Sequence, residues 1–347
     1  MTLWLIDLEA VETRYTKQWK TELPAILKRH GHKIKIVSGG ETPQATTPGA
    51  FLNFGGTNVY KSKQLEIIAE AFCNGEVEQG DYFLYTDAWN PTVIQLKYMA
   101  ELLGVKIRIG GLWHAGSYDP ADFLGRLIGD KPWVRNAERS MYECFDHNFF
   151  ASQFHIDMFF KAFPELDRSR AVRTGWPMEY MAKTLAIYKN MPKRNLILFP
   201  HRIAPEKQVE IFRDLKQHLS QYEFVVCQER QLTKNEYHNL LGEAKMVFSA
   251  NLQETLGISW YEGALVDAIP MIPDRLSYSE MALDTFKYPS VWTESYTAYE
   301  THRKQLIDKI IHYMENYNTF KSNIKKQADL LTNDYFSANN LYKTIKV

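Results

Sequence analysis

The stretch SANLQETLGISWYEGALVDAIPMIP, residues 249–273, carries two glutamates eight positions apart between two apolar runs. It completes an apolar segment typical of a buried strand, crosses a short polar loop and enters a helical pattern that starts near Ile258. Glu254 is therefore expected just before a helix N-terminus, and Glu262 about one turn inside the helix. Strand, loop and helix in this order form one repeating unit of a parallel α/β sheet.

The same alternation runs through the rest of the chain. The predicted strands cover residues 3–8, 33–39, 81–87, 105–111, 147–152, 170–175, 195–200, 223–228, 245–250 and 269–273. The predicted helices include residues 15–31, 92–104, 205–219 and 234–244. This pattern predicts an α/β protein with two doubly wound, Rossmann-like halves.

A polar segment around Pro192 separates the two halves. The expected division is an N-terminal domain at residues 1–175, a linker at 176–193, a second domain at 194–330 and a closing helix at 331–347. Ligands of doubly wound sheets bind at the carboxyl ends of the strands, here most naturally in the cleft between the halves.

Composition limits the class of protein. The chain of 347 residues is 45% hydrophobic and 24% charged, as in globular proteins, and its 41 basic and 41 acidic residues cancel. A net charge of zero indicates no particular partner. Cys73, Cys144 and Cys227 have no metal-ligand spacing and are expected to be reduced thiols of a cytoplasmic protein. No apolar run approaches the length of a membrane span, and the apolar start is expected to be a strand rather than a signal peptide.

Polar residues follow two predicted strands of the second half. Arg202 and Lys207 flank the turn before helix 205–219, where a pair of cations suits a diphosphate, although an ordinary solvated turn gives the same pattern. Gln228 and Arg230 lie at the end of the next predicted strand and are candidates for recognising the edge of a nucleobase.

The loop before Ile258 is the third strand-end segment of this half. Its backbone N–H groups around Thr255, Leu256 and Gly257 are expected to face an anion, and glycine allows a close approach of that backbone. The two flanking glutamates then suit the sugar and ribose hydroxyls of a sugar nucleotide. A helix-start glutamate favoured by the dipole, with a second surface glutamate, is the alternative for this motif alone.

Together these segments resemble the donor-binding half of the retaining GT-B glycosyltransferases of family four. That family carries Arg…Glu-Lys followed by Glu-x7-Glu, and Arg202, Lys207, Glu254 and Glu262 stand at the matching positions. The resemblance covers roughly residues 170–347. It implies the GT-B fold, a C-terminal helix that crosses back to the first domain, and a nucleotide-diphosphate sugar, UDP-linked, as donor.

The first half resembles the family only in layout, because it lacks the Gly-Gly loop that usually follows the first strand. His114 stands where the family often has a histidine facing the donor sugar, although a strand-end histidine is often structural. Asp87, the last residue of the predicted strand 81–87, is a candidate for orienting an acceptor hydroxyl.

The resemblance also implies retention of anomeric configuration. In that reaction the leaving diphosphate takes the acceptor proton on the same face of the sugar, while cations and amides stabilise its charge. Arg202, Lys207 and the amides near Gly257 would carry this role, and Glu254 and His114 complete the predicted catalytic set. No Asp-x-Asp sequence occurs, so we predict chemistry that needs neither a metal nor a cofactor.

The acceptor is predicted from a basic stretch. Residues 14–35 contain seven lysines and arginines against Glu22 alone. Tyr15 and Trp19 share one helix face and, with Arg14 and Lys17, suit DNA with an extruded base, although a solvated amphipathic helix has the same pattern. The favoured acceptor is a 5-hydroxymethylated pyrimidine in DNA, since phage enzymes that glycosylate such bases share this fold and also lack the Gly-Gly loop. A saccharide or lipid acceptor is the alternative for a hexosyl- or pentosyltransferase.

Two other classes of protein share the two-domain layout. A non-hydrolysing nucleotide-sugar epimerase would interconvert sugar nucleotides with no acceptor present. A catalytically silent DNA- or sugar-binding protein would keep the fold without turnover. Product analysis with a labelled donor, with and without acceptor, separates all three.

Overall fold

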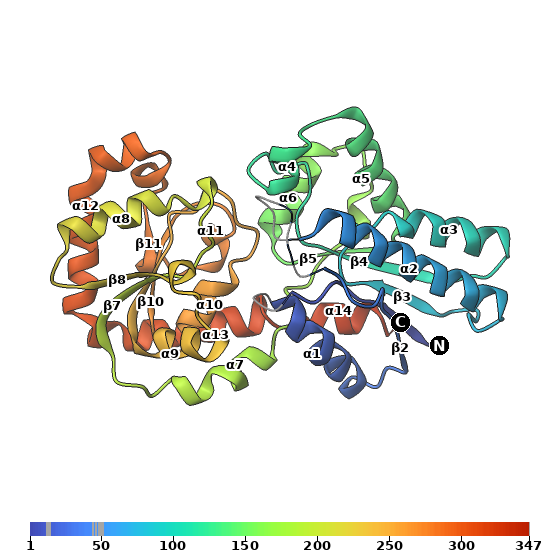
Figure 1. Ribbon diagram of the computed structural model, residues 1–347, viewed down its shortest axis with the longest axis horizontal. Helices are drawn as coiled ribbons and strands as arrows, with labels where there is room; N and C mark the ends of the chain where they lie inside the picture. Colours follow the sequence, from blue (N-terminus) through green and yellow to red (C-terminus); the bar gives the residue numbers. More distant parts are fainter. Residues whose placement is uncertain (12–14, 44, 46, 48–51, 347) are drawn as a thin grey trace. The chain divides into compact units, whose positions relative to one another are not determined.

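The computed structural model describes residues 1–11, 15–43, 45, 47 and 52–346. The chain forms two compact units (Figure 1): Met1–Pro177 with Ala338–Val347 make up unit 1, and Met178–Ser337 make up unit 2. The chain thus leaves unit 1 after Pro177 and returns to it for its final residues. Within the segment expected to be a linker, helix α7 (Tyr180–Leu185) belongs to unit 2.

Unit 1 contains a parallel sheet of six strands in the order β2-β1-β3-β4-β5-β6. Its strands are β1 (Leu3–Ile6), β2 (Ile34–Val37), β3 (Tyr82–Tyr85), β4 (Arg108–Trp113), β5 (His147–Phe150) and β6 (Ala171–Arg173). Its helices are α1 (Tyr15–Arg29), α2 (Phe54–Cys73), α3 (Thr92–Leu102), α4 (Phe123–Leu127), α5 (Pro132–Cys144), α6 (Gln153–Ala162) and α14 (Asn339–Thr344). Figure 1 shows α2, α3 and α5 on one face of this sheet and α1 and α14 on the other.

Unit 2 contains a parallel sheet of five strands in the order β11-β10-β9-β7-β8. Its strands are β7 (Arg194–Phe199), β8 (Glu223–Val226), β9 (Ala244–Phe248), β10 (Ile269–Pro273) and β11 (Lys287–Tyr288). Its helices, besides α7, are α8 (Val209–His218), α9 (Lys234–Glu243), α10 (Ile258–Leu265), α11 (Tyr278–Met281), α12 (Tyr296–Glu315) and α13 (Lys321–Asp334). Short 3-10 turns at η3 (Pro205–Lys207), η4 (Cys227–Arg230) and η6 (Ser290–Thr293) follow the ends of β7, β8 and β11.

Each sheet buries a separate aromatic core. In unit 1 the Trp113 ring stacks on Phe150 at 6.1 Å and packs against Phe159 at 5.1 Å, measured between ring centroids. In unit 2 the Phe212 ring packs against Phe199 at 5.3 Å. Burying each such ring contributes about 1.5–3 kcal/mol, so both units have the core that an independent domain needs.

The predicted α/β class is confirmed, and all ten predicted strands occur. The prediction extended the strand at 223–228 too far, since β8 ends at Val226 and η4 follows directly. The prediction also contained no helix where α2 lies and no strand where β11 lies. None of the helices in the described ranges combines the length and apolar character needed to cross a membrane.

Candidate functional site

The loop between β9 and α10 forms the centre of the candidate site in unit 2. Gly257 is the N-cap of α10 and has a positive φ of 83°, a backbone conformation that disfavours residues with a Cβ. A Cβ at Gly257 would also lie 2.5 Å from the Trp260 ring. Glycine therefore allows the sharp entry into α10, whose first N–H groups lack helical partners and are available to an anion.

Lys207 connects the turn after β7 to this loop. Its Nζ donates to the carbonyl oxygen of Gln253 at 2.5 Å and lies 3.4 Å from Oε2 of Glu254. The two charged side chains are only 8% and 18% exposed, so their attraction is screened less than that of a surface pair. The fold thus brings together two predicted site residues that are 47 positions apart.

Arg202, the other predicted cation, begins the same turn and forms an ion pair with Glu206. The Glu206 side chain is buried, while Arg202 is partly exposed. Each predicted cation therefore has a carboxylate beside it. A bound diphosphate would share these cations with Glu206 and Glu254 or displace the carboxylates from them.

Glu262 occupies a different environment from Glu254. It lies in the second turn of α10, is buried, and accepts a hydrogen bond from Oη of Tyr237 at 2.8 Å. Burial raises the pKa of the Glu262 carboxyl to about 7, against the opposing effect of the Tyr237 hydroxyl. The two glutamates of the sequence motif thus have separate partners, Lys207 and Tyr237.

Two other predicted donor-site residues lie in η4, with different surroundings. Oε1 of Gln228 accepts a hydrogen bond from the backbone N–H of Ile203, which links η4 to the turn that carries Arg202. Arg230 instead lies 3.6 Å from Glu223, the first residue of β8. Its guanidinium therefore has a carboxylate partner within β8, and its role towards a nucleobase stays a prediction.

The loop itself uses one of the amides that were expected to face an anion. The N–H of Leu256 is directed at Oε1 of Glu254, 3.5 Å away, and the Leu256 side chain is buried. Thr255 is partly exposed in the same loop. The Glu254 side chain thus contacts both the turn that carries Lys207 and its own loop.

The sequence analysis did not identify two buried polar residues near this loop, Asn251 and His201. Nδ2 of Asn251 lies 3.4 Å from Oε2 of Glu254 and donates to Oη of Tyr278 at 3.0 Å. Nδ1 of His201 lies 3.4 Å from Oγ of Ser259, in the first turn of α10. Burial, and secondarily Lys207, lowers the pKa of His201 to about 3, so this ring is neutral. A polar residue directly after an apolar strand was the signal available for both His201 and Asn251.

In unit 1 both ring nitrogens of His114 have partners. Nε2 lies 2.7 Å from the carbonyl oxygen of Thr86, and Nδ1 lies 2.7 Å from Oη of Tyr15. A carbonyl oxygen only accepts, so Nε2 carries a proton, and in that tautomer of the uncharged ring Nδ1 accepts from Tyr15. The His114 ring also packs against Trp19 and Trp176, with centroids 5.6 Å and 4.8 Å away.

The helix face predicted to meet an acceptor points into unit 1. Tyr15 and Trp19 do contact each other, in an edge-on arrangement at 5.3 Å, as their spacing indicated. Trp19 is only 3% exposed, however, so its ring offers no surface on which an extruded base could stack in this conformation. Lys17 is exposed, and Arg14 lies outside the described residues.

Asp87, the remaining predicted acceptor residue, lies in the turn after β3. Its Oδ1 accepts from the backbone N–H of Trp89 at 3.1 Å, a contact that shapes the turn itself. Asp87 is partly exposed. Because this turn follows β3, Asp87 lies at the carboxyl end of the strands, as its position at the end of a predicted strand indicated.

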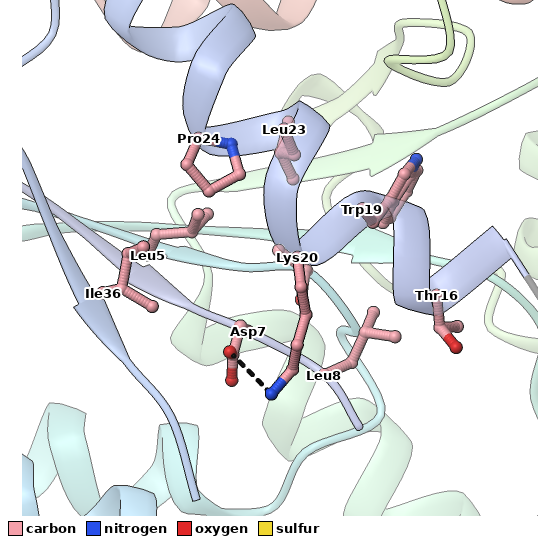
Figure 2. Close-up of a pocket in the computed structure, with 10 residues that line it drawn as sticks. Leu5, Asp7, Leu8, Thr16, Trp19, Lys20, Leu23, Pro24 and Ile36 are labelled. Atoms are coloured by element: carbon pink, nitrogen blue, oxygen red, sulfur yellow. Dashed lines mark ion pairs between the residues drawn. The ribbon is translucent and has the colours of Figure 1, made fainter. Parts of the chain in front are cut away.

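A small pocket in unit 1 lies beside the charged pair Asp7 and Lys20 (Figure 2). Nζ of Lys20 is 3.3 Å from Oδ2 of Asp7 and donates to Oγ of Ser38 at 3.2 Å. Burial raises the pKa of Asp7, while the Tyr60 hydroxyl and Lys20 oppose this effect. The pocket has room for about one water molecule and is lined mainly by apolar side chains, so it is too small for a sugar ring.

No protein-family model and no curated protein sequence matches the chain. Solved structures do resemble it over its full length. WaaG, a glycosyltransferase involved in lipopolysaccharide biosynthesis, has a TM-score of 0.61 at 11% identity, with 99% of each chain covered. The catalytic domain of starch synthase IV from Arabidopsis thaliana, bound to ADP and acarbose, has a TM-score of 0.59 at 10% identity, again with 99% of each chain covered.

A third structure matches over a smaller part of its own length. The pneumococcal O-GlcNAc transferase GtfA, in complex with UDP and GlcNAc, has a TM-score of 0.55 at 10% identity, with 82% of this chain and 60% of that chain covered. At sequence identities this low, the structural similarity establishes the fold alone. The chain has the GT-B fold, with two parallel-sheet α/β domains.

Proposed function

We propose that this protein is a glycosyltransferase that moves a sugar from a nucleotide-diphosphate sugar to a hydroxyl group of a saccharide. The observation that carries the proposal is the contact between Lys207 and Glu254 at the start of α10, on a GT-B fold. This contact brings a buried cation from the turn after β7 to the carboxylate of the loop that leads into the N-terminus of α10. Such a loop suits a diphosphate that is attached to a hydroxyl-rich ring.

Lys207 and the first amides of α10 would hold the diphosphate of the donor. As the bond between the sugar and the diphosphate oxygen breaks, negative charge grows on that oxygen, and the acceptor hydroxyl forms the new bond to the same carbon. The acceptor proton passes to the departing diphosphate, which requires no separate base on the opposite face of the sugar. This course retains the configuration at the anomeric carbon, as the resemblance to family four implies. Removing one preorganised donor to such a growing charge costs about 3–4 kcal/mol of barrier.

Glu254 and Glu262 would divide the recognition of the donor. Glu254, beside Lys207, would accept hydrogen bonds from hydroxyls of the transferred sugar. Glu262 is buried against Tyr237 of α9 and would accept from the ribose hydroxyls. The identity of the base stays a prediction: UDP is expected, the similar structure of GtfA holds UDP, and that of starch synthase IV holds ADP.

We also propose that transfer needs no divalent metal. Metal ions in many transferases neutralise the leaving diphosphate, and here Lys207, Arg202 and the α10 amides would supply the positive charge. Support comes from the position of both cations in one turn after β7, next to the Glu254 loop. Their carboxylate partners lower the local net charge, so the chelator experiment below tests this part separately.

A saccharide is the proposed acceptor because of two observations in unit 1. The buried Trp19 ring lacks the exposed face that base stacking needs, and Lys20 is paired with Asp7. Both residues belong to the stretch from which a DNA acceptor was predicted. In addition, the structure of starch synthase IV holds the saccharide acarbose. Transfer to 5-hydroxymethylated pyrimidines in DNA stays a prediction for the same experiment to decide.

The test is product analysis by mass spectrometry with UDP-glucose and ADP-glucose as donors. Acceptors are a panel of oligosaccharides and DNA duplexes that contain 5-hydroxymethylcytosine, 5-hydroxymethyluracil or only standard bases. We expect transfer to a saccharide that is lost in Lys207→Ala and kept in Lys326→Ala, a change of an exposed lysine on α13. Interconversion of donors without acceptor would indicate an epimerase, and nucleotide binding without turnover a binding protein. Either result overturns the proposal.

A further inference from the structure

Arg275 lies in the loop after β10 and joins the loops that follow the two neighbouring strands. Its Nε donates to the carbonyl oxygen of Asn251 at 2.7 Å, and its Nη2 to that of Ala250 at 2.7 Å. On the other side Nη1 donates to the carbonyl oxygen of Ser290 at 3.0 Å, and Nη2 to both oxygens of Thr293 at 3.1 Å. One guanidinium thus holds five oxygen atoms from the loops after β9 and β11.

Gln208 makes a second connection between the same two loops. It follows Lys207 directly, and its Nε2 donates to the carbonyl oxygens of Ala250 at 2.6 Å and Thr293 at 2.7 Å. Its backbone has a positive φ of 52°, a strained conformation for a residue other than glycine. We call Arg275 and Gln208 the loop clamp. It also reaches the turn that carries Lys207.

The loop clamp fixes the residues that lead up to Glu254. The carbonyl oxygens of Ala250 and Asn251 are held by Arg275, and the N–H of Leu252 donates to the carbonyl oxygen of Glu206 at 2.8 Å. The next carbonyl oxygen, that of Gln253, accepts from Lys207. Every residue from 250 to 253 therefore has a backbone atom that is hydrogen-bonded to another loop. These bonds restrict the position of the Glu254 side chain relative to Lys207.

The guanidinium is suited to this task in a way that lysine is not. It presents five N–H donors in a rigid plane, whereas an ammonium group presents three on one atom. Within the described part of the chain no carboxylate oxygen lies within ion-pair distance of Arg275. The hydrogen bonds of Arg275 all go to carbonyl and hydroxyl oxygens of the loops after β9 and β11. The side chain therefore fixes the orientation of these two loops.

We propose that Arg275 is a positioning residue of the transferase, which holds Glu254 in register with Lys207 for reaction without touching the substrate. This inference rests on the proposed function. Misplacing a reacting group by about 1 Å can cost about a hundredfold in rate. Loss of the guanidinium is therefore expected to lower kcat while sparing nucleotide affinity, because Glu262 and Tyr237 belong to α10 and α9, outside the loop clamp.

The experiment compares Arg275→Ala and Arg275→Lys with the parent protein and with Arg194→Ala. Arg194 is the matched control, since it begins β7, at the amino end of the strands, and forms ion pairs with Glu223 and Glu243 at 2.8 Å and 2.7 Å. We expect kcat to fall about ten- to a hundredfold in both Arg275 variants, with the dissociation constant for the free nucleotide changed less than about twofold. Added methylguanidinium should restore part of kcat in Arg275→Ala and none in Arg275→Lys.

Hydrogen exchange of residues 250–254, followed by mass spectrometry, separates two kinds of failure. If the parent transfers no sugar but Arg275→Lys loosens this segment, the proposed function has failed and the loop clamp stands as a structural feature. If the parent is active and Arg275→Lys keeps its kcat, the inference is wrong. Equal losses of kcat and nucleotide affinity, without rescue, would also overturn it, because they indicate general damage to unit 2. If Arg275→Ala does not fold, Arg275→Lys alone decides.

Discussion

The hydroxyl of Tyr15 lies 2.7 Å from Nδ1 of His114, whose other ring nitrogen lies 2.7 Å from the carbonyl oxygen of Thr86. The histidine that was predicted to face the donor sugar therefore already has two partners. A sugar hydroxyl can reach Nδ1 only by replacing the Tyr15 hydroxyl. On the prediction that His114 faces the donor sugar, the Tyr15 hydroxyl competes with that sugar for Nδ1.

Tyr15→Phe should expose this acceptor. We expect the KM for the donor to fall at least about twofold, while unfolding stability decreases by about 0.5–1.5 kcal/mol for the lost hydrogen bond. Steady-state kinetics and thermal denaturation measure the two effects. Tyr98→Phe, at an exposed position on α3, is the control and should change neither. A rise in KM for Tyr15→Phe would show that the hydroxyl itself assists binding.

The two glutamates of α10 and its preceding loop should have separable effects. Glu262→Ala should weaken binding of the free nucleotide, because it removes the proposed ribose contact. Glu254→Ala should leave nucleotide affinity nearly intact and reduce turnover by about a hundredfold or more. Calorimetry and initial rates test this, with Glu300→Ala, at an exposed site on α12, as control. Equal effects of both changes on nucleotide affinity would refute the division of roles.

The Glu262 carboxyl also predicts a pH dependence of stability. Its pKa is raised to about 7 by burial, above its usual value, so the folded protein binds more protons than the unfolded chain between these two values. Stability from this group is present at acid pH and is lost as pH rises towards 7, by at most about 1.4 kcal/mol per pH unit. Glu262→Gln should remove this slope in denaturant titrations between pH 5 and 8. A parent protein with the same slope as Glu262→Gln would contradict it.

Nucleotide affinity should change with pH in the opposite direction. Ribose hydroxyls donate to a carboxylate more strongly than to a protonated carboxyl, so binding favours the ionised form of Glu262. The dissociation constant for free nucleotide is expected to fall as pH rises through about 7. Calorimetry at a series of pH values measures it, and Glu262→Gln should show no such trend. A flat profile for the parent protein would place the ribose elsewhere.

Chelation tests the proposed absence of a metal requirement. With excess EDTA, initial rates should remain within about twofold of the untreated protein, because Lys207, Arg202 and the α10 amides are assigned the diphosphate charge. The control is a known metal-dependent transferase treated in the same way. Rates that collapse with EDTA and return with Mg²⁺ or Mn²⁺ would show that the carboxylate-paired cations are insufficient.

The strands could be predicted because buried parallel strands are apolar runs bounded by polar residues. Helix α2 could not, because its buried face is partly polar. Gln64 and Tyr60 from this helix bind Asp7, and Thr57 binds Glu9. A periodic pattern of apolar residues is therefore interrupted where the helix meets the carboxyl end of β1, although the helix is long and regular.

The candidate site was predictable only as far as the local motifs extend. The spacing of Glu254 and Glu262 indicated a loop and a helix start, and the structure contains both. The carboxylate beside Arg202 could be predicted from the four-residue spacing between Arg202 and Glu206. The contacts of Arg275 could not be predicted, because its partners are backbone carbonyl oxygens, which every residue type carries. Spacing also placed Tyr15 and Trp19 on one face without showing that this face is buried.

Helix α14, the red segment among the elements of unit 1 in Figure 1, has a consequence for protein synthesis. Asn340 donates to the carbonyl oxygen of Arg173 on the edge strand β6 at 3.0 Å, and Tyr342 stacks on His30 at 4.1 Å. A ribosome makes all of unit 2 before it reaches these residues, which takes roughly ten to thirty seconds at ordinary rates. During that interval unit 1 is a nascent domain whose edge strand β6 lacks its contact with α14.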